Sequence, residues 1–229
     1  MVSYLMTHSL LASWLYTMKE NPYEDATSTR DSFQEFLQTL RREPIPPNEA
    51  MMKGLEFEDL CYAIANGTFQ PVKELVHDKK GIPVIEPNTG EPFEITKYPR
   101  FYDAASQVAD IVRGGQIQYK AKKLIEVSGI QFVLYGRLDV LKAGTVYDIK
   151  FSGSYDKGKF FDSTQHPTYM ELIPEADQFT YIVSNGQNVW TETYRRDETR
   201  AIRPVISDFV EWLNAVGLMD TYKEYWKSL

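Results

Sequence analysis

The chain has 229 residues, 43% of them hydrophobic and 25% charged, a composition that is ordinary for a globular protein and excludes a disordered, collagen-like or repeat protein. Its one cysteine, Cys61, excludes a disulfide framework, a cysteine-ligated zinc ribbon and a four-cysteine iron–sulfur cluster, so we expect any bound metal to be held mainly by oxygen atoms. No apolar run approaches the roughly 20 residues of a membrane helix, and the N-terminus lacks the features of a signal peptide, so we expect a cytoplasmic protein without membrane contact.

The net charge of −7 is distributed unevenly along the chain. Between Arg113 and Lys159, nine Lys and Arg residues stand against four Asp and Glu residues, a local charge of +5 that leaves −12 for the rest of the chain. Such an acidic protein is not a general nucleic-acid coat, but the basic stretch is compatible with a local cleft for an anionic substrate. A solvated face of a sheet accounts for the same charges equally well.

Helical periodicity dominates the first hundred residues. Apolar residues predict a helix over residues 3–20, and the capping residues at 27–31 precede a second helix. A third helix is predicted over residues 48–64. Glycine and proline make residues 78–100 a turn-rich loop with room for a small hairpin, and a helix over 101–112 ends at a Gly-Gly pair.

The second half of the chain is predicted to contain most of the strands. Segments rich in Val, Ile, Tyr and Phe, separated by Ser-Gly and Ala-Gly turns, predict strands over residues 117–127, 130–141 and 145–151. These are followed by a loop over 152–169, a helix over 171–184, an extended segment over 189–195 and a closing helix that begins at Pro204. We therefore expect an α/β (α+β) fold with a central mixed β-sheet flanked by helices.

Two aspartates on neighbouring predicted strands are the first candidates for chemistry. Alternation along the middle strand places Asp139 and Arg137 on one face. If Ala143-Gly144 forms a two-residue hairpin turn, Asp139 lies directly opposite Asp148, and Arg137 lies opposite Lys150. Like charges at such a position are destabilising, so something must offset the repulsion.

A divalent cation offsets that repulsion well, because Mg²⁺ takes oxygen ligands and commonly uses one or two carboxylates together with water and substrate phosphate. Lys150, two residues beyond Asp148, would face the same site and orient or help to deprotonate an attacking water near a phosphate. In the alternative interpretation, Arg137 and Lys150 simply neutralise two solvated carboxylates.

The pattern Gly136-x-x-Asp139 followed by Asp148-x-Lys150 resembles the core of the PD-(D/E)XK nuclease superfamily. Two further patterns resemble its RecB-type and lambda-exonuclease-like branches: Gly54-x-x-x-Glu58 on a helix ahead of the sheet, and Gln178-x-x-Tyr181 on the predicted helix after the Asp-x-Lys strand. The resemblance spans about residues 54–195. Its specificity lies in the order of the four elements, since the Asp-x-Lys tripeptide recurs in the loop at residues 78–80.

This resemblance implies a restriction-endonuclease-like core over residues 48–229, an N-terminal helical extension over 1–47, and one compact unit overall. It implies a Mg²⁺- or Mn²⁺-dependent DNA nuclease, an exonuclease of the type that phages use in replication and recombination. Partners would be DNA and a single-strand-annealing or recombination protein, and some relatives form oligomeric rings. The implied roles are metal binding by Glu58, Asp139, Asp148 and the carbonyl of Ile149, catalysis by Lys150, and support of the site or the DNA by Gln178, Tyr181 and Arg137.

Several alternatives stay open at this stage. Glu56 and Asp59 compete with Glu58, because residues one or two apart on a helix point to different sides. The loop around His166 mixes basic and aromatic residues that could grip single-stranded DNA or form a plain surface flap. The protein as a whole could be an inactive nuclease-like module that binds DNA or assists recombination, or an acidic protein-interaction domain.

Overall fold

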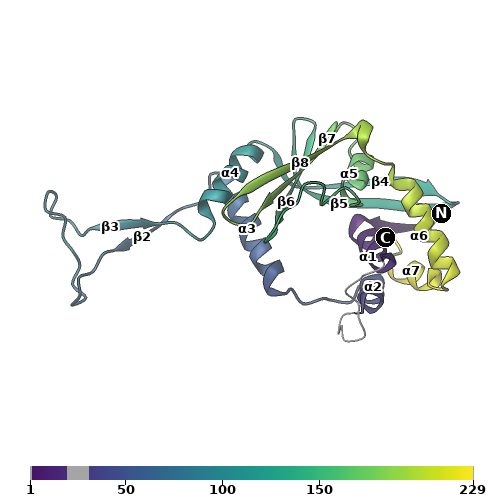
Figure 1. Ribbon diagram of the computed structural model, residues 1–229, viewed down its shortest axis with the longest axis horizontal. Coiled ribbons are helices and arrows are strands. Elements are labelled where there is room, and N and C mark those ends of the chain that lie inside the picture. The colour runs from purple at the N-terminus through teal and green to yellow at the C-terminus, as the bar shows by residue number, and fades with distance from the viewer. Residues whose placement is uncertain (1, 20–30, 229) are drawn as a thin grey trace.

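A central mixed sheet flanked by helices organises the computed structural model, which describes residues 2–19 and 31–228 (Figure 1). The expected α/β (α+β) class is therefore confirmed. The strands follow one another as β1-β5-β6-β7-β8, with β4 paired to β5 off this path. Their bounds are β1 (Ser3–Thr7), β4 (Gln116–Val127), β5 (Ile130–Lys142), β6 (Thr145–Phe151), β7 (Gln178–Ser184) and β8 (Val189–Arg195).

Parallel and antiparallel pairs are mixed within this sheet. The pairs β1 with β5 and β6 with β7 are parallel, whereas β4 with β5, β5 with β6, and β7 with β8 are antiparallel. Ala143 and Gly144 both have positive φ, as a two-residue hairpin turn of type I′ requires. The pairs Val140 with Tyr147 and Leu141 with Val146 confirm the predicted register next to that turn.

Helices cover both faces of the sheet and bury two apolar clusters. The larger cluster joins α1, α2, α5, α6 and α7 to one face, where Leu134, Leu138 and Phe179 are fully buried. The smaller cluster joins α3 and α4 to the other face around Val140 and Ile182. The helices are α1 (His8–Met18), α2 (Ser32–Leu40), α3 (Glu49–Ala65), α4 (Tyr102–Val112), α5 (Gln165–Leu172), α6 (Ile202–Ala215) and α7 (Met219–Tyr225).

One predicted helix starts too early and another is wrong. The helix expected over residues 3–20 begins only at His8, because Ser3–Thr7 forms strand β1 beside β5. The helix expected over 171–184 is instead the end of α5 and the whole of β7, whose Phe, Thr, Tyr, Ile and Val side chains favour a strand. Of the expected caps, Asp31 caps α2 through its side chain, and residues 27–30 lie outside the described residues.

A hairpin arm projects far from the body of the protein (Figure 1). Its stem is an antiparallel pair of short strands, β2 (Val72–Leu75) and β3 (Glu94–Lys97), in which every residue is exposed. Residues 78–93 between the two strands form turns and isolated bridges, in which the Val84 N–H donates to the Val76 carbonyl and the Phe93 N–H to the Val84 carbonyl, so the expected turn-rich segment with a small hairpin is confirmed.

Candidate active site

A gap between two strands along one edge of β5 creates the candidate site. That edge pairs with β1 as far as Tyr135 and with β6 from Val140 onward, so the residues between them have no strand partner on that side within the described chain. Such a split in a sheet exposes backbone and side-chain groups where a ligand can reach them. Asp139 lies in this gap, one residue before the pairing with β6 begins.

The carboxylate of Asp139, and not a backbone carbonyl of β5, accepts the next hydrogen bond from β6. Its Oδ2 atom accepts a hydrogen bond of 2.8 Å from the backbone N–H of Ile149. The expected alternation breaks at this point, since Leu138 packs in the larger apolar cluster while Val140 packs in the smaller one. Gln118, across from Asp139 on β4, has a positive φ of 55° and is likewise missing from the ladder. The ladder therefore ends before the expected direct pair of Asp139 with Asp148.

Arg137 is also not placed opposite Lys150 as the extrapolated register predicted. It pairs with Lys120 of β4, and its side chain is exposed. Its backbone carbonyl accepts a hydrogen bond of 2.9 Å from the hydroxyl of Tyr169 on α5.

Asp148 is almost completely buried, with a relative exposure of 2%. Its Oδ1 atom accepts a short hydrogen bond from the side-chain amide of Gln165 on α5. Its Oδ2 atom lies 2.8 Å from the Nζ atom of Lys150 but has no hydrogen bond of adequate geometry in the described structure. A buried carboxylate oxygen with only an ion pair has spare capacity to bind a further cation.

Glu58 of α3 faces the same gap from the other layer. Its Oε1 atom accepts hydrogen bonds of 2.8 Å from the Tyr62 hydroxyl and 2.9 Å from the Gln118 amide. Glu56 and Asp59, the competing carboxylates of this helix, are exposed, whereas Glu58 is partly buried. The helix thus turns Glu58, and not its two rivals, toward the sheet.

The charges of these side chains act on one another strongly. Burial, followed by the charges of Asp148 and Glu58, raises the pKa of Asp139 well above its usual range. Burial lowers the pKa of Lys150, but the charge and ion pair of Asp148, with smaller effects of Asp139 and Glu58, raise it by more, so this pKa lies above its usual value. Three acidic groups therefore lie close to a single ammonium, that of Lys150, and the raised pKa of Asp139 reflects their mutual repulsion.

Two residues on α5 that sequence reasoning missed complete the site. Gln165 and Tyr169 are four apart, so they share a face of the helix, and they bond to Asp148 and to the Arg137 carbonyl respectively. Gly136 permits this approach, because a Cβ atom there would overlap the Tyr169 ring. The i, i+4 spacing was a usable signal, but Pro167 between the two residues argued against a helix, although proline is tolerated in a first turn.

Gln178 and Tyr181 lie on β7 and not on a helix. Gln178 pairs with Thr145 at the far end of the parallel ladder, on the opposite face of β7 from Tyr181. Tyr181 is the strand neighbour of Asp148, but it is fully buried, lies 3.1 Å by its hydroxyl from the Nδ1 atom of His166, and stacks on Phe160. The structure thus makes Tyr181 part of the support behind the site and keeps Gln178 away from it.

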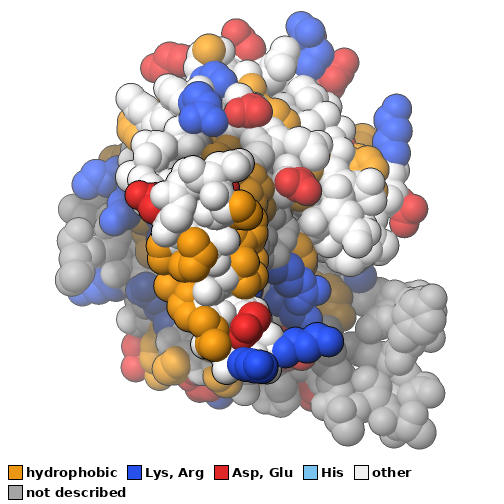
Figure 2. Space-filling model, turned by 90° about the vertical axis from the view of Figure 1, so that its left-hand side faces the viewer, with side chains coloured by type: hydrophobic (Ala, Val, Ile, Leu, Met, Phe, Trp, Pro, Cys, Tyr) orange, Lys and Arg blue, Asp and Glu red, His pale blue; other side chains and the backbone are white. Residues whose placement is uncertain are grey.

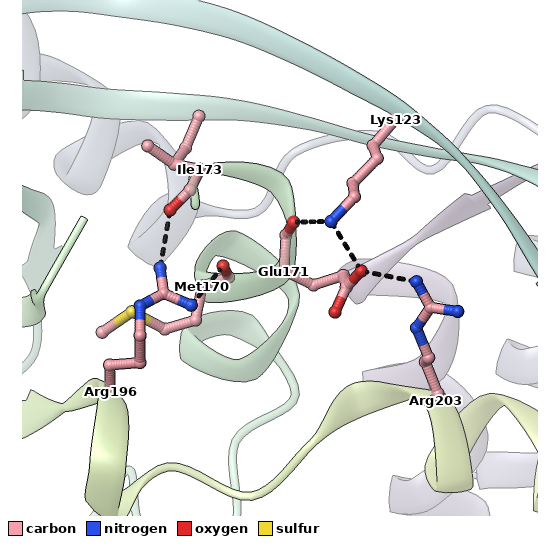
Figure 3. A network of polar contacts seen from close by, with 6 residues as sticks. All are labelled: Lys123, Met170, Glu171, Ile173, Arg196 and Arg203. Carbon is pink, nitrogen blue, oxygen red and sulfur yellow. Dashed lines mark hydrogen bonds and ion pairs between the residues drawn. The ribbon is translucent and has the colours of Figure 1, made fainter. Parts of the chain in front are cut away.

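The short helix α5 is held in place from its C-terminal end (Figure 3). Pro174 has no N–H to complete the helical bond to the Met170 carbonyl, so Arg196 supplies the donor at 3.0 Å. The same guanidinium donates to the carbonyls of Ile173 and Ala176. Beside it, Lys123 and Arg203 bind the Glu171 carboxylate at 2.8 and 2.9 Å (Figure 3).

His8, at the start of α1, borders the gap because it directly follows the last residue of β1. Its ring makes an edge-on contact with Tyr169 at 5.4 Å between centroids, and its carbonyl accepts a hydrogen bond from Thr164. Burial and then the nearby charge of Lys150 lower the pKa of His8 to about 4, so its imidazole is neutral at physiological pH. Sequence spacing gave no indication of this position, since the contact spans most of the chain.

A buried glutamate organises the loop between β6 and α5. Glu192 of β8 accepts hydrogen bonds from the Tyr155 hydroxyl and from the backbone N–H groups of Gly158 and Phe160. The next residue, Phe161, is 70% exposed beside this anchored backbone. His166 is buried and stacks on Tyr194, so it is a core residue and does not form part of a surface that binds single-stranded DNA.

The donor chemistry fits a hard divalent cation, although the side chains do not form a finished cage. Within residues 2–19 and 31–228, no three His, Cys, Asp or Glu side chains converge closely enough to hold a metal ion. The oxygen atoms of Asp139, Asp148 and Glu58 are nevertheless the ligand type that Mg²⁺ and Mn²⁺ prefer, and the Oδ2 atom of Asp148 has an ion pair with Lys150 but no hydrogen bond in the described structure.

Comparisons with known proteins find solved structures whose TM-scores to this chain are low. The crystal structure of SSO0001 has 20% sequence identity and a TM-score of 0.39, covering 49% of this chain and 65% of that one, so this chain spans only part of the length of SSO0001. The crystal structure of LHK-Exo in complex with dAMP has 14% identity and a TM-score of 0.36, covering 96% of this chain and 92% of that one. No protein-family profile and no curated protein matches the sequence. We therefore base the function on the residues of the site.

None of the helices in the described parts of the chain combines the length and apolarity needed to cross a membrane.

Proposed function

We propose that this protein is a Mg²⁺- or Mn²⁺-dependent deoxyribonuclease that hydrolyses phosphodiester bonds at DNA ends. The observation that supports this proposal is that Asp139, Asp148, Glu58 and Lys150 all border the gap in the β5 edge, where burial and the charges of Asp148 and Glu58 raise the pKa of Asp139. Strongly perturbed ionisable groups at a break in a sheet are a functional-site signal, because an excess of buried negative charge is costly unless a ligand compensates it.

Glu58, Asp139, Asp148 and the carbonyl of Ile149 are the groups that would hold the cation. When bound, the cation would supply Lewis-acid stabilisation of the charge that develops on the scissile phosphate. The carboxylate of Asp139 is already oriented for this role by the Ile149 N–H, and that of Asp148 by the Gln165 amide. The site is thus partly preorganised before any ion enters.

Lys150 would orient the attacking water and donate hydrogen bonds to it or to a phosphate oxygen. Because its pKa is raised, Lys150 is a cation in the metal-free protein, so donation suits it better than removal of a proton. In the reaction, the water oxygen forms a bond to phosphorus while the bond to the leaving sugar oxygen breaks, and the water proton passes to solvent as that oxygen gains one. The exposed Arg137 lies next to this position and would contact a DNA phosphate.

The choice of ends over internal bonds, and a role in phage-type replication or recombination beside a strand-annealing partner, rest on the resemblance of the Gly54-x-x-x-Glu58 and Gln178-x-x-Tyr181 patterns to the RecB-type and lambda-exonuclease-like branches. We include Gln165 among the residues that would support the reaction, because its amide donates to Asp148, and we leave out Gln178, because it pairs with Thr145 at the far end of the ladder. Tyr181 would act only indirectly, by packing behind Asp148.

The decisive experiment compares wild type with Asp148→Asn and Lys150→Met on end-labelled linear DNA and on closed circular DNA, with Mg²⁺, Mn²⁺ or EDTA. Glu56→Gln is the matched control, because Glu56 lies on the same helix as Glu58 but is exposed. We expect metal-dependent loss of the linear substrate by wild type and Glu56→Gln, and a loss of activity of about 100-fold or more in the two site variants. Melting curves verify that each variant is folded.

Other outcomes would replace this proposal. Cleavage of circular DNA would identify an endonuclease, and cleavage of RNA alone would change the substrate. DNA retained in a gel shift without cleavage would favour an inactive binding module. Metal linkage gives an independent readout, since a cation that binds only the folded state raises the melting temperature. We expect Mg²⁺ or Mn²⁺ to raise it for wild type and Glu56→Gln, and not for Asp148→Asn.

A further inference from the structure

The hairpin arm, residues 72–98, has no apolar core of its own. Its stem is two strands only, and a two-stranded sheet is at best marginally stable in water. Its outer part is formed by two turns, in which the Asp78 side chain accepts from the N–H groups of Lys80 and Ile82, and Glu86 and Gly90 close the second turn. Local hydrogen bonds thus define the shape of the arm, but burial does not stabilise it.

Large apolar side chains are gathered on this arm and face solvent. Figure 2 looks at the molecule from the side of the arm and shows hydrophobic side chains massed at the front, with basic and acidic side chains at one end. A contiguous exposed apolar surface of this kind marks an interaction site in a soluble protein. The side chains concerned are 37–65% exposed and comprise Val72, Leu75, Ile82, Val84, Ile85, Phe93, Ile95 and Tyr98.

The charge of the arm argues for a protein partner and against DNA. Residues 72–98 contain four Lys and Arg residues and five Asp and Glu residues, a net charge of −1. DNA binding draws most of its affinity from cationic side chains that neutralise phosphates, so this surface is unsuited to it.

The charges of the arm are also separated in a way that fits a second copy of itself. In the stem, Lys73 pairs with Glu94 and Lys97 pairs with Glu74. In the outer part, Lys79 and Lys80 on the first turn and Glu86 and Glu91 around the second turn make no ion pair within the described chain. The acidic groups border a mainly polar hollow of about 650 Å³, lined by Leu75, Glu86, Glu91, Pro92, Phe93 and Glu94.

We propose that two copies of this chain associate through their arms, with the Lys79–Ile82 turn of each copy in the acidic hollow of the other. The turn presents two ammonium groups, which match the carboxylates of the hollow, and the Ile82 side chain, which is 57% exposed and would contact Leu75 and Phe93 of its lining. A two-fold interface requires such a self-complementary surface, because the same patch contributes on both sides. The arm has 27 residues, within the roughly 20–30 residues a side of a specific interface.

The test uses two charge-reversal variants of the full chain, Lys79→Glu/Lys80→Glu and Glu86→Lys/Glu91→Lys, in sedimentation velocity over a range of concentrations. We expect wild type to sediment as a dimer of the 26.5 kDa chain. Each variant alone should dissociate at least about tenfold more readily, because like charges then face one another. An equimolar mixture of the two variants should restore the dimer, since opposite charges face again.

The control is Lys120→Glu/Lys122→Glu, which reverses two exposed lysines on β4 of the body and should leave the dimer intact. A monomeric wild type at every concentration overturns the proposal, whatever the arm then binds. Dimers that persist in both arm variants, or a mixture that fails to reassociate, also overturn it. The nuclease assay is separate from this test, because no arm residue belongs to the candidate active site.

Discussion

Replacement of Arg196 by methionine should destabilise the protein far more than the same replacement of Arg203. The two arginines flank the same short helix α5 but bind different groups (Figure 3). Arg196 donates to backbone carbonyls of Met170, Ile173 and Ala176, residues that are at most 7% exposed. Arg203 donates to the Glu171 carboxylate and is itself 46% exposed in its side chain.

The change in unfolding free energy depends on which groups each substitution leaves without a hydrogen-bond partner. A buried carbonyl without a donor costs about 1–3 kcal/mol. The Ile173 carbonyl keeps a second bond from the Ala176 N–H, so the main cost of Arg196→Met falls on Met170 and Ala176. We expect a loss of about 3 kcal/mol in the free energy of unfolding, which is about 6–12 °C in melting temperature for a chain of this size. An exposed ion pair contributes about 0–1 kcal/mol, so Arg203→Met should change the melting temperature by no more than a few degrees.

Differential scanning calorimetry on the two variants and wild type, in the same buffer with EDTA, measures both differences. Methionine keeps most of the apolar stem of arginine, so the comparison isolates the guanidinium. Equal destabilisation by the two substitutions would refute the reasoning that the buried carbonyls, and not the surface charge, make Arg196 important. A small effect of Arg196→Met would mean that water reaches those carbonyls.

Three other expectations concern single positions. Gly136→Ala should cost about 1–3 kcal/mol in chemical denaturation, because its Cβ atom would overlap the Tyr169 ring, whereas Gly153→Ala, with open space around it, should cost little. Burial raises the pKa of Glu192, but its hydrogen bonds lower that pKa by more. The Glu192 carboxylate therefore stabilises the fold above the usual carboxyl pKa, and this stabilisation is lost as the pH falls through the lower pKa of the folded state. The difference in unfolding free energy between wild type and Glu192→Gln should shrink from about pH 7 to about pH 3, and a constant difference would contradict this assignment. Burial raises the pKa of Cys61 to about 12, so iodoacetamide at pH 8 should modify it only after unfolding, as mass spectrometry would show.

The parts of the fold set by local pattern could be predicted from the sequence. The hairpin of β5 and β6 was predicted with its register, because Ala143-Gly144 lies between two apolar runs of alternating character. Helix α3 was predicted within one residue at each end, because Asn48 caps its first turn and Asn66-Gly67 follows its last. Local signals of this kind act within a few residues and need no partner elsewhere.

What failed depended on contacts between distant parts of the chain. Ser3–Thr7 has too few residues for its period to distinguish a strand from a helix, and only its partner on β5 decides. At the site, the register was extrapolated through Asp139, where the real ladder ends because a side chain replaces the backbone acceptor. Gln165 was overlooked because its role at the site depends on one contact, with Asp148, and no sequence pattern near either residue indicates that contact.

The position of β1 imposes an order on folding during synthesis. Its only strand partner in the described sheet, β5, begins at Ile130, and its other edge bonds to Trp226 and Ser228 near the end of the chain. At about 5–20 residues per second, the ribosome needs about 6–25 s after β1 before residues 131–135 exist. During that interval the segment Ser3–Thr7 has no native strand to pair with, and its outer edge is covered only after Trp226 and Ser228 have been synthesised. Docking of β1 onto the sheet is therefore a late event that joins segments far apart in the described chain, and a chaperone that shields nascent apolar segments would find Ser3–Thr7 unpaired throughout that interval.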